Sequence, residues 1–168
     1  MPRCLSIFLP PREDGAPLPL AALADWHRRF TPLAAVDAPD GVMLDIAGAA
    51  HLFGGERTML LHIEEELARR GFSARGAVAP TPEAANALAR FGESPVAKRM
   101  IAAEADERMI FRAVSNLPVR ALRLDDDICT ALSQSGLKRI GDIWLRPRAP
   151  LAARFGAKLF ATLDAMMG

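Results

Sequence analysis

The segment from Leu33 to Ile46 constrains the fold of this chain more than any other. Two apolar runs, Leu33 to Val36 and Val42 to Ile46, flank the tripeptide Pro39-Asp40-Gly41. Proline, aspartate and glycine are the residues that tight turns favour, and apolar runs on either side of such a turn indicate paired strands. The segment therefore predicts a β-hairpin around which the other elements are arranged.

Four carboxylates lie within or soon after the predicted hairpin, at Asp37, Asp40, Asp45 and Glu56. Carboxylates that point outward from the end of a sheet hold hard cations such as Mg2+ in phosphoryl-transfer enzymes. The alternative is local: Asp40 forms the turn, the other two aspartates end strands, and Glu56 opens a helix. The first interpretation predicts a metal-dependent phosphoryl-transfer enzyme, and it requires at least two of the four carboxylates to converge.

Length and composition indicate one globular domain, or one domain with a small appendage. The chain has 168 residues, of which 51% are hydrophobic and 24% charged, as in an ordinary soluble protein with a packed core. Its two cysteines, Cys4 and Cys129, are far apart in sequence, so neither a disulfide framework nor a zinc site is expected. No apolar run reaches membrane-spanning length, and the run from Cys4 to Leu9 is too short for a signal peptide. We expect a cytoplasmic protein without a membrane partner.

The periodicity of the first hundred residues predicts an α+β domain. Besides the hairpin, strands are expected at residues 4–9 and 72–79, and helices at 19–30, 56–70 and 82–91. Thr81 is placed to cap the last of these helices, with Pro82 at its first position. His27 is expected on the surface, near the C-terminal end of its helix. This order of elements suits a small antiparallel or mixed sheet with helices over one face, followed by a short helix within residues 100–110.

The C-terminal part has a helical pattern throughout. Helices are expected from Asp125 or Asp126 to Ser135 and from about 157 to 167, with Asp142 as the N-cap of a helix at 143–146. The link between the helix that ends at Ser135 and the helix at 143–146 contains Lys138 and Arg139, between Gly136 and Gly141. Short helices joined in this way are typical of helix-hairpin-helix proteins, whose N–H groups and cations hold DNA phosphates. The alternative is a plain pair of helices with lysine and arginine on its surface.

The charge distribution is compatible with a polyanionic partner on one side of the molecule. The formal net charge of the chain is only +1. From Arg112 onward there are nine Lys and Arg residues against five Asp and Glu, whereas the preceding part has twelve against fifteen. A basic C-terminal third is a modest electrostatic indication of nucleic-acid binding.

A sequence motif overlaps the end of the hairpin and reads Met43-Leu44-Asp45-Ile46-Ala47-Gly48, followed by His51-Leu52-Phe53-Gly54-Gly55-Glu56. It resembles the central palm motif of the ImuB proteins, the polymerase-like branch of the Y-family (lesion-bypass) DNA polymerases. Further similarity to that family follows in the family's order, at residues 23–33, 76–85, 117–124, 135–142 and 154–156. The resemblance implies a palm-like α+β domain at 1–112 and a thumb-like, all-α helix-hairpin-helix domain at 113–168.

The departures from the family pattern imply that this homologue is not catalytic. Active relatives carry Ser-Ile-Asp-Glu where this chain has Ala38-Pro39-Asp40-Gly41, so the aspartate is kept and the glutamate is lost; Asp45 matches an aspartate that is structural in the family. Residues 3–11 contain no carboxylate where active relatives have a metal-binding aspartate, and the lysines expected near Thr81 and Asn86 are absent. Two-metal phosphoryl transfer depends on such groups. No cofactor is therefore expected, unless the degenerate site at Asp40 and Gly41 retains weak Mg2+ binding.

The resemblance also implies a shortened polymerase. The fingers are replaced by a loop near residues 11–18, and the chain ends at Gly168, before the family's little finger and the tail with its clamp-binding motif. We expect weak, sequence-independent binding of primer-template DNA in SOS mutagenesis and translesion synthesis, and the family implies a RecA-like accessory protein and an error-prone polymerase as partners. A decayed fragment without independent activity is the remaining alternative. The residues expected to contact the DNA backbone are Gly136, Lys138, Arg139, Gly141, Arg146, Arg148, Arg154 and Lys158.

Overall fold

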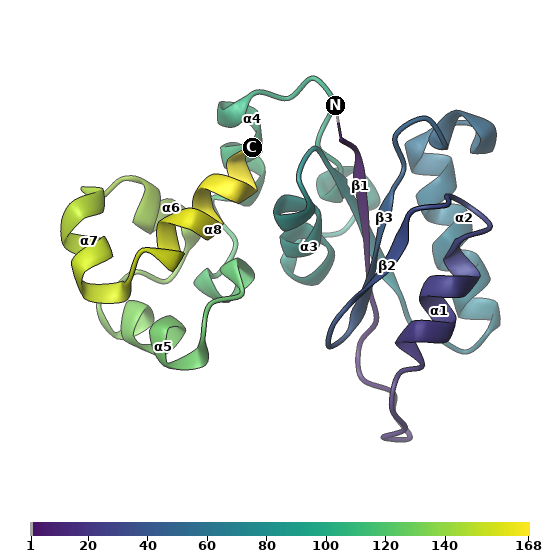
Figure 1. Ribbon diagram of the computed structural model, residues 1–168, viewed down its shortest axis with the longest axis horizontal. Coiled ribbons are helices and arrows are strands. Elements are labelled where there is room, and N and C mark those ends of the chain that lie inside the picture. The colour runs from purple at the N-terminus through teal and green to yellow at the C-terminus, as the bar shows by residue number, and fades with distance from the viewer. Residues whose placement is uncertain (1) are drawn as a thin grey trace.

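The computed structural model describes residues 2–168 and is built on a four-stranded sheet (Figure 1). The strands are β1 (Cys4–Phe8), β2 (Ala34–Asp37), β3 (Gly41–Asp45) and β4 (Arg75–Ala79), in the order β2-β3-β1-β4. Every neighbouring pair is antiparallel. The predicted hairpin is confirmed: β2 and β3 pair with Asp37 opposite Gly41, and the turn between them holds a cis Ala38–Pro39 peptide bond.

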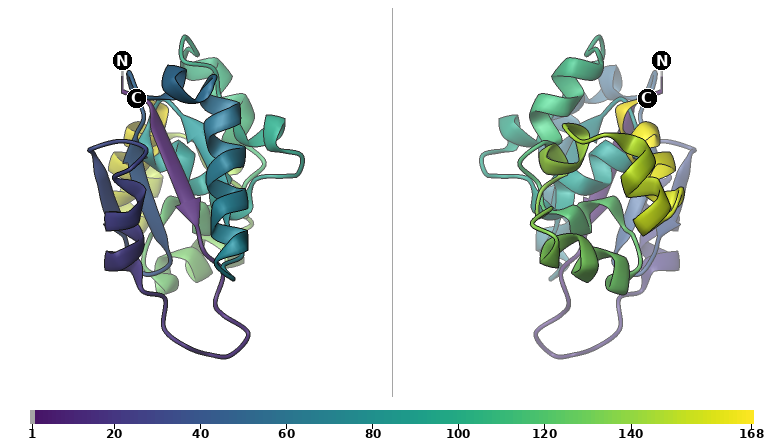
Figure 2. Two further views of the ribbon diagram at one scale, coloured as in Figure 1. Left: turned by 90° about the vertical axis from the view of Figure 1, so that its right-hand side faces the viewer. Right: turned by 90° about the vertical axis from the view of Figure 1, so that its left-hand side faces the viewer.

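Helices cover both faces of the sheet, so the prediction that they cover one face was wrong. The helices α1 (Leu20–His27) and α2 (Glu56–Arg69) pack on one face, and α3 (Pro82–Phe91) lies on the other (Figures 1 and 2). Alternate strand residues explain the arrangement: Leu5 and Ile7 join the core beneath α1 and α2, whereas Cys4 joins the core around α3. Both faces of β1 are therefore buried.

Local sequence fixes the start of α3 as predicted. The Thr81 hydroxyl accepts a hydrogen bond from the Ala84 N–H, and Pro82 occupies the first helical position. Thr81 also donates its hydroxyl proton to the Met166 carbonyl at 2.8 Å. The same residue thus caps α3 and ties it to the end of the chain.

His27 is completely buried, which corrects the expectation of a surface histidine. It lies one turn after Leu23 and one turn before Phe30, on the side of α1 that faces the sheet, and its Nδ1 is 2.6 Å from the Leu23 carbonyl oxygen. Burial lowers the pKa of His27 from its ordinary value of 6.5, because the charged imidazolium would lose its hydration. The ring is therefore an uncharged part of the core.

The C-terminal part is helical, as predicted, but its boundaries differ in three places. The expected helix at 100–110 begins later, as α4, because Asp106 caps it by accepting from the Met109 N–H. Asp142 lies in the third position of its helix instead of at the N-cap. A helix that was not predicted, α7, precedes the last one. The elements are α4 (Glu107–Val114), α5 (Asp126–Gln134), α6 (Ile140–Trp144), α7 (Arg148–Phe155) and α8 (Lys158–Met167), with short 3-10 turns η1 (Ala50–Phe53), η2 (Val96–Arg99) and η3 (Val119–Leu122).

One apolar core joins α3 to the C-terminal helices. It runs from Ala77 and Ala79 of the sheet through Leu88 of α3 to Leu132 and Leu163. α4 spans the predicted boundary between residues 112 and 113, so the division into palm-like and thumb-like domains stays a prediction. Among the described residues, no helix combines the length and apolar character needed to cross a bilayer.

Candidate functional site

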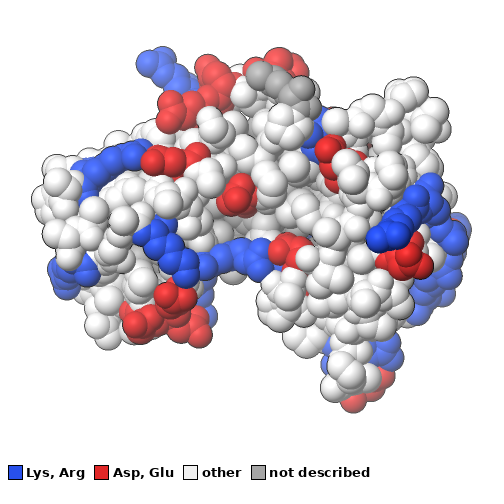
Figure 3. All heavy atoms as spheres, viewed as in Figure 1, with Lys and Arg blue, Asp and Glu red and all other residues white. Residues whose placement is uncertain are grey.

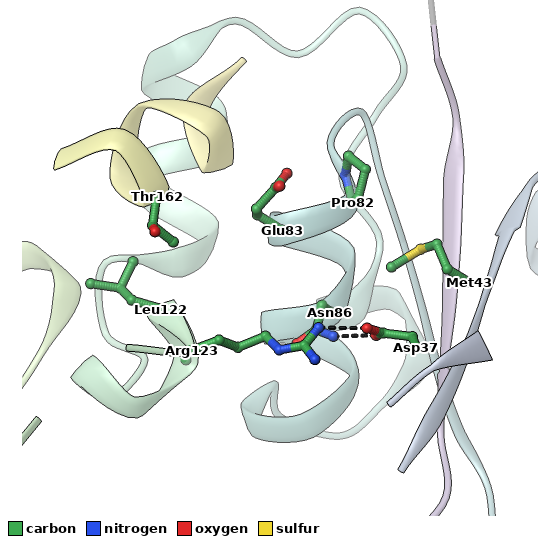
Figure 4. Close-up of a pocket in the computed structure, with 9 residues that line it drawn as sticks. Asp37, Met43, Pro82, Glu83, Asn86, Leu122, Arg123 and Thr162 are labelled. Carbon is green, nitrogen blue, oxygen red and sulfur yellow. Dashed lines mark hydrogen bonds and ion pairs between the residues drawn. The ribbon is translucent and has the colours of Figure 1, made fainter. Parts of the chain in front are cut away.

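The two carboxylates of the hairpin, Asp37 and Asp40, are held by arginines that come from elsewhere in the chain. Figure 4 shows one of these, Arg123, reaching Asp37. Arg90 of α3 donates two hydrogen bonds to Asp40 Oδ1, one of them from Nε at 3.2 Å, and its Nη2 lies 3.5 Å from Asp37 Oδ2. Arg123 donates from Nη1 to Asp37 Oδ1 at 2.5 Å and from Nη2 to the Ala38 carbonyl. Asn86 completes the set by donating from Nδ2 to Asp37 Oδ2.

The ion pairs of Arg90 are largely removed from solvent, whereas the Arg123 side chain is 46% exposed. The side chains of Arg90, Asp37 and Asp40 are 10%, 13% and 28% exposed. The Arg90 guanidinium also lies over the Phe8 ring, 5.3 Å from its centroid. Both oxygens of Asp37 and Oδ1 of Asp40 already accept hydrogen bonds, so a divalent cation would compete with these guanidinium groups for the three oxygens.

The positions beside Asp40 add no metal ligand. Leu9 donates its N–H to the Asp40 carbonyl at 2.8 Å, so the end of the first strand brings a buried leucine next to the turn. Gly41 is closed to any side chain, because a Cβ there would lie 2.8 Å from the Ile7 carbonyl oxygen and 3.0 Å from Arg90 Nη2. Restoring a carboxylate at Gly41 therefore requires the backbone to move.

The four-carboxylate metal site considered from the sequence does not form. Asp45 is at the far end of β3 from the turn, about 13 Å from Gly41 at 3.3 Å per residue, and its Oδ1 accepts from the Ala47 N–H. Glu56 pairs with Arg3, accepting from Nε at 2.6 Å. Within residues 2–168, no group of three or more His, Cys, Asp or Glu side chains is placed to hold a metal ion. Asp37 and Asp40 do lie together on Arg90, so a metal-dependent phosphoryl-transfer centre on two of the four carboxylates stays a prediction.

A cavity of about 360 Å³ lies beside the arginine-bound carboxylates, between the hairpin, α3 and the C-terminal helices. Figure 4 shows Glu83 and Thr162 on one side of it and Asp37 with Arg123 on the other. Arg123 is the only non-glycine residue among those described with a positive φ, at 52°. Its backbone conformation directs the side chain across the cavity's edge to the hairpin.

The predicted DNA-binding link at 136–141 uses its N–H groups internally. Asp142 Oδ2 accepts from the N–H groups of both Lys138 and Arg139 at 2.9 Å. Ile140 and Gly141 donate to the carbonyls of Leu117 and Ser115, at 3.0 and 2.9 Å, and Gly136 donates to Ser133. In this conformation a phosphate can therefore be bound only through side chains.

The cations expected to contact DNA are exposed but partly paired. Arg148 forms a two-pronged ion pair with Asp164, and Lys158 Nζ lies 3.2 Å from Asp125 Oδ1. Arg139 donates to Asn116, and no ion pair with a described residue is made by Lys138, Arg146 or Arg154. On the face shown in Figure 3, basic side chains over α5–α8 alternate with acidic ones. The DNA-binding set, Gly136 and Gly141 included, stays a prediction.

Comparison with known proteins gives a strong sequence match. No protein-family model matches the chain. The chain is 45% identical over 158 residues to Protein ImuB from two strains of Caulobacter vibrioides, and the match covers 94% of this chain. The chain is homologous to part of ImuB. It spans about a third of the length of these ImuB proteins, since the match covers 32% of each.

Solved structures show the same fold. DinB from Sulfolobus solfataricus matches 87% of this chain, with a TM-score of 0.63 and 16% identity, and 42% of its own length is covered. A Dbh ternary complex and an insertion ternary complex of Dbh DNA polymerase each give a TM-score of 0.61 over 87% of this chain, at 16% and 15% identity, covering 43% and 42% of those chains. The ImuB-like chain thus has the α+β fold of part of a Y-family DNA polymerase, as the sequence motifs predicted.

Sequence reasoning missed the arginines that fill the hairpin site of this ImuB homologue. Arg90 lies four residues after Asn86, so the two share one face of α3, and both are polar in an alanine-rich helix. That pattern is the signal that could have found them. Arg123 carried no comparable signal, because its partner Asp37 is 86 residues away.

Proposed function

We propose that this chain is a non-catalytic, ImuB-like accessory protein of lesion bypass that binds DNA weakly through its C-terminal helices. The observation that carries the proposal is the pairing of Asp37 and Asp40 with Arg90 and Arg123. A polymerase needs carboxylates that are free to bind two metal ions. Here the remaining carboxylates of the turn are neutralised by the chain itself.

Two further features support the absence of nucleotidyl transfer. The end of β1 brings Leu9, not an aspartate, beside Asp40. Gly41 has no space for the glutamate that active relatives carry there. One substitution would therefore not rebuild a metal site, and Mg2+ has no role in the proposed function.

The proposed DNA contact rests on side-chain charge. Because the N–H groups of the 136–141 link bond within the protein, phosphates are left to Lys138, Arg139, Arg146, Arg148, Arg154 and Lys158. Contacts of this kind position a protein on DNA without reading bases. We propose weak, sequence-independent and salt-sensitive binding to primer-template DNA.

The test is a titration of the purified chain into fluorescent primer-template DNA at 50 and 200 mM salt. If four phosphates are neutralised, affinity should fall by about a hundredfold between the two salt concentrations, from a slope of about −0.9 per phosphate. Replacing Lys138, Arg139, Arg146 and Arg148 together by alanine should abolish binding.

The matched control removes the same charge from the opposite side of the molecule, at exposed arginines just after α1 and within α2. These substitutions, at Arg28, Arg29, Arg57 and Arg69, should leave most of the binding intact. Equal losses in the two variants would point to a net-charge effect and contradict a DNA site on the C-terminal helices. No binding of the unmodified chain at 50 mM salt would favour a decayed fragment in which only the fold survives.

The proposed role extends to partners and compartment by analogy with ImuB. We propose that the chain acts in the cytoplasm, where a bacterial chromosome lies, in SOS-type mutagenesis beside a RecA-like accessory protein and an error-prone polymerase. Support for these partners comes from sequence similarity to ImuB alone. Co-purification with each candidate, compared with the quadruple variant above, separates a protein contact from a contact bridged by DNA.

A further inference from the structure

The cavity beside the hairpin combines apolar walls with a carboxylate that has no partner among the described residues. Figure 4 shows Met43 of β3 on one side of the cavity and Leu122 of η3 on the opposite side. Glu83, in the first turn of α3, is half-buried there, and its carboxylate forms no ion pair or hydrogen bond within the described chain. The volume of about 360 Å³ lies at the lower end of the range for small-molecule sites. The cavity can therefore hold a small molecule with an apolar body.

The other polar groups at the cavity are acceptors or are already paired. Asn86 is 2% exposed, and because its Nδ2 donates to Asp37, the atom left without a partner is the acceptor Oδ1. Arg123 donates from both terminal nitrogens, to Asp37 and to the Ala38 carbonyl. The Thr162 hydroxyl has no hydrogen-bond partner among residues 2–168 and can accept as well as donate. The cavity therefore offers a ligand more acceptors than donors.

The charges that line and surround the cavity leave Glu83 uncompensated. Two carboxylates, Asp37 and Glu83, line the cavity against the single guanidinium of Arg123, which Asp37 already binds. Three further cations of this region are each paired with other carboxylates: Arg90 with Asp37 and Asp40, Arg3 with Glu56, and Lys158 of α8 with Asp125. Arg120 of η3 has no carboxylate partner in the described chain. Burial raises the pKa of Cys129 in α5 and Arg120 opposes the rise, so the Arg120 charge lies toward α5.

The pKa of Cys4 in β1 reflects the negative charge at this end of the sheet. Burial raises the pKa of this thiol, the charges of Asp45 and Glu83 raise it further, and Arg3 opposes them. Asp45 is half-buried, accepts from the Ala47 N–H, and has no ion pair with a described residue. The end of the cavity at Glu83 is therefore electronegative.

This chemistry disfavours anions and divalent metals as ligands. A phosphate group would face the unpaired Glu83 carboxylate, and like charges repel strongly where they are partly removed from water. A divalent cation needs several oxygen ligands, and both Asp37 oxygens already accept hydrogen bonds. A primary ammonium group has three donors and needs only one carboxylate with neutral acceptors beside it. Glu83 and Thr162, which lie on the same side of the cavity, supply such a set (Figure 4).

We propose that the cavity binds a small organic cation, a primary amine on an apolar body. Its ammonium group donates to Glu83 and Thr162, and its body packs between Met43 and Leu122. Hydrogen bonds between an ammonium group and a carboxylate are charge-assisted and stronger than those between neutral groups. The site is independent of the DNA proposal, because no residue that lines the cavity belongs to the proposed DNA contacts.

The test compares three probes that share a phenyl body and differ in charge: phenethylamine, phenethyl alcohol and hydrocinnamate, which are cationic, neutral and anionic at neutral pH. Binding to the whole chain is followed by NMR through the methyl signals of Met43 and Leu122. The amine should bind about tenfold more tightly than the alcohol, because it adds a hydrogen bond to a charged group. Hydrocinnamate should bind least. A deoxynucleoside triphosphate without metal should not displace the amine.

Two variants locate the binding. Glu83→Gln should weaken the amine about tenfold and leave the alcohol unchanged, with urea unfolding as the check that the variant keeps its fold. The matched control, Glu107→Gln, removes a carboxylate from the first turn of α4 and should leave the amine unaffected. The proposal is overturned if the three probes bind equally, if the amine does not bind, or if the two variants act alike. Displacement of the amine by the triphosphate would assign the cavity to nucleotides and would also overturn it.

Discussion

Replacing Arg90 by methionine removes the cation between the two hairpin carboxylates and keeps an apolar stem over Phe8. Breaking a buried ion pair by removing one partner costs about 3–5 kcal/mol. Asp40 is 28% exposed, and Asp37 keeps Arg123 and Asn86 as partners, so the cost should fall just below that range. We expect the free energy of unfolding to fall by about 2–3 kcal/mol. For a chain of this length the midpoint of thermal unfolding should drop by about 4–12 °C.

The assay is urea unfolding followed by circular dichroism, with thermal unfolding as a second readout. The matched control is Arg69→Met, because Arg69 pairs with Glu65 and Glu66 on the exposed side of α2, where an ion pair contributes about 0–1 kcal/mol. Equal stability of Arg90→Met and the unmodified chain would refute the inference that Arg90 neutralises the turn. The unmodified chain should also show no thermal shift with millimolar Mn2+, because a ligand stabilises only a site that it can occupy.

Three further perturbations test separate parts of the account. Gly41→Ala should lower the free energy of unfolding by about 1–3 kcal/mol, because the new methyl group overlaps the Ile7 carbonyl; an unchanged urea midpoint would contradict that close approach. Arg123→Gly should be more stable than Arg123→Ala by about 1 kcal/mol, because only glycine adopts a φ of 52° without strain, and equal urea midpoints would argue against the strain. Stability should decline as the pH falls below about 6.5, because the unfolded chain then binds a proton that buried His27 does not, and the decline should end below the lowered pKa. His27→Leu should flatten this part of the profile, and an unchanged slope would mean that other groups cause it.

The regular elements could be predicted from the sequence because their signals are local. The hairpin has its turn residues between apolar runs, α2 has an apolar stripe that includes Leu60 and Ile63, and α3 has Thr81 and Pro82 at its start. Each of these signals acts within a few residues. The family motifs then implied the fold of part of a Y-family polymerase, which the structural neighbours confirm. The strand order β2-β3-β1-β4 was not predicted.

The errors at His27 and α7 have physical causes that the spacing of apolar residues along the sequence does not reveal. His27 was placed on the surface because it is polar and near a helix end, but its position relative to Leu23 and Phe30 puts it on the buried side. α7 was missed because Pro147 and Pro150 signal a turn, although a proline in the first turn of a helix costs no hydrogen bond.

The site could be predicted only in part. The sequence showed which carboxylates were lost, and it named Asp40 as the one retained. It did not show what holds Asp40, because Arg90 is 50 residues away and meets it only when α3 packs under the hairpin. Likewise, the use of Asp142 as an internal acceptor for the Lys138 and Arg139 N–H groups follows from the path of the link, not from its composition.

The central claim is that the chain keeps a polymerase fold without polymerase chemistry. The most direct measurement is primer extension by the purified chain with all four deoxynucleoside triphosphates and either Mg2+ or Mn2+, beside an active Y-family polymerase. The account predicts no extension product with either metal, at protein concentrations that saturate the DNA. Extension by even one nucleotide that disappears when Asp40 is replaced by alanine would contradict it.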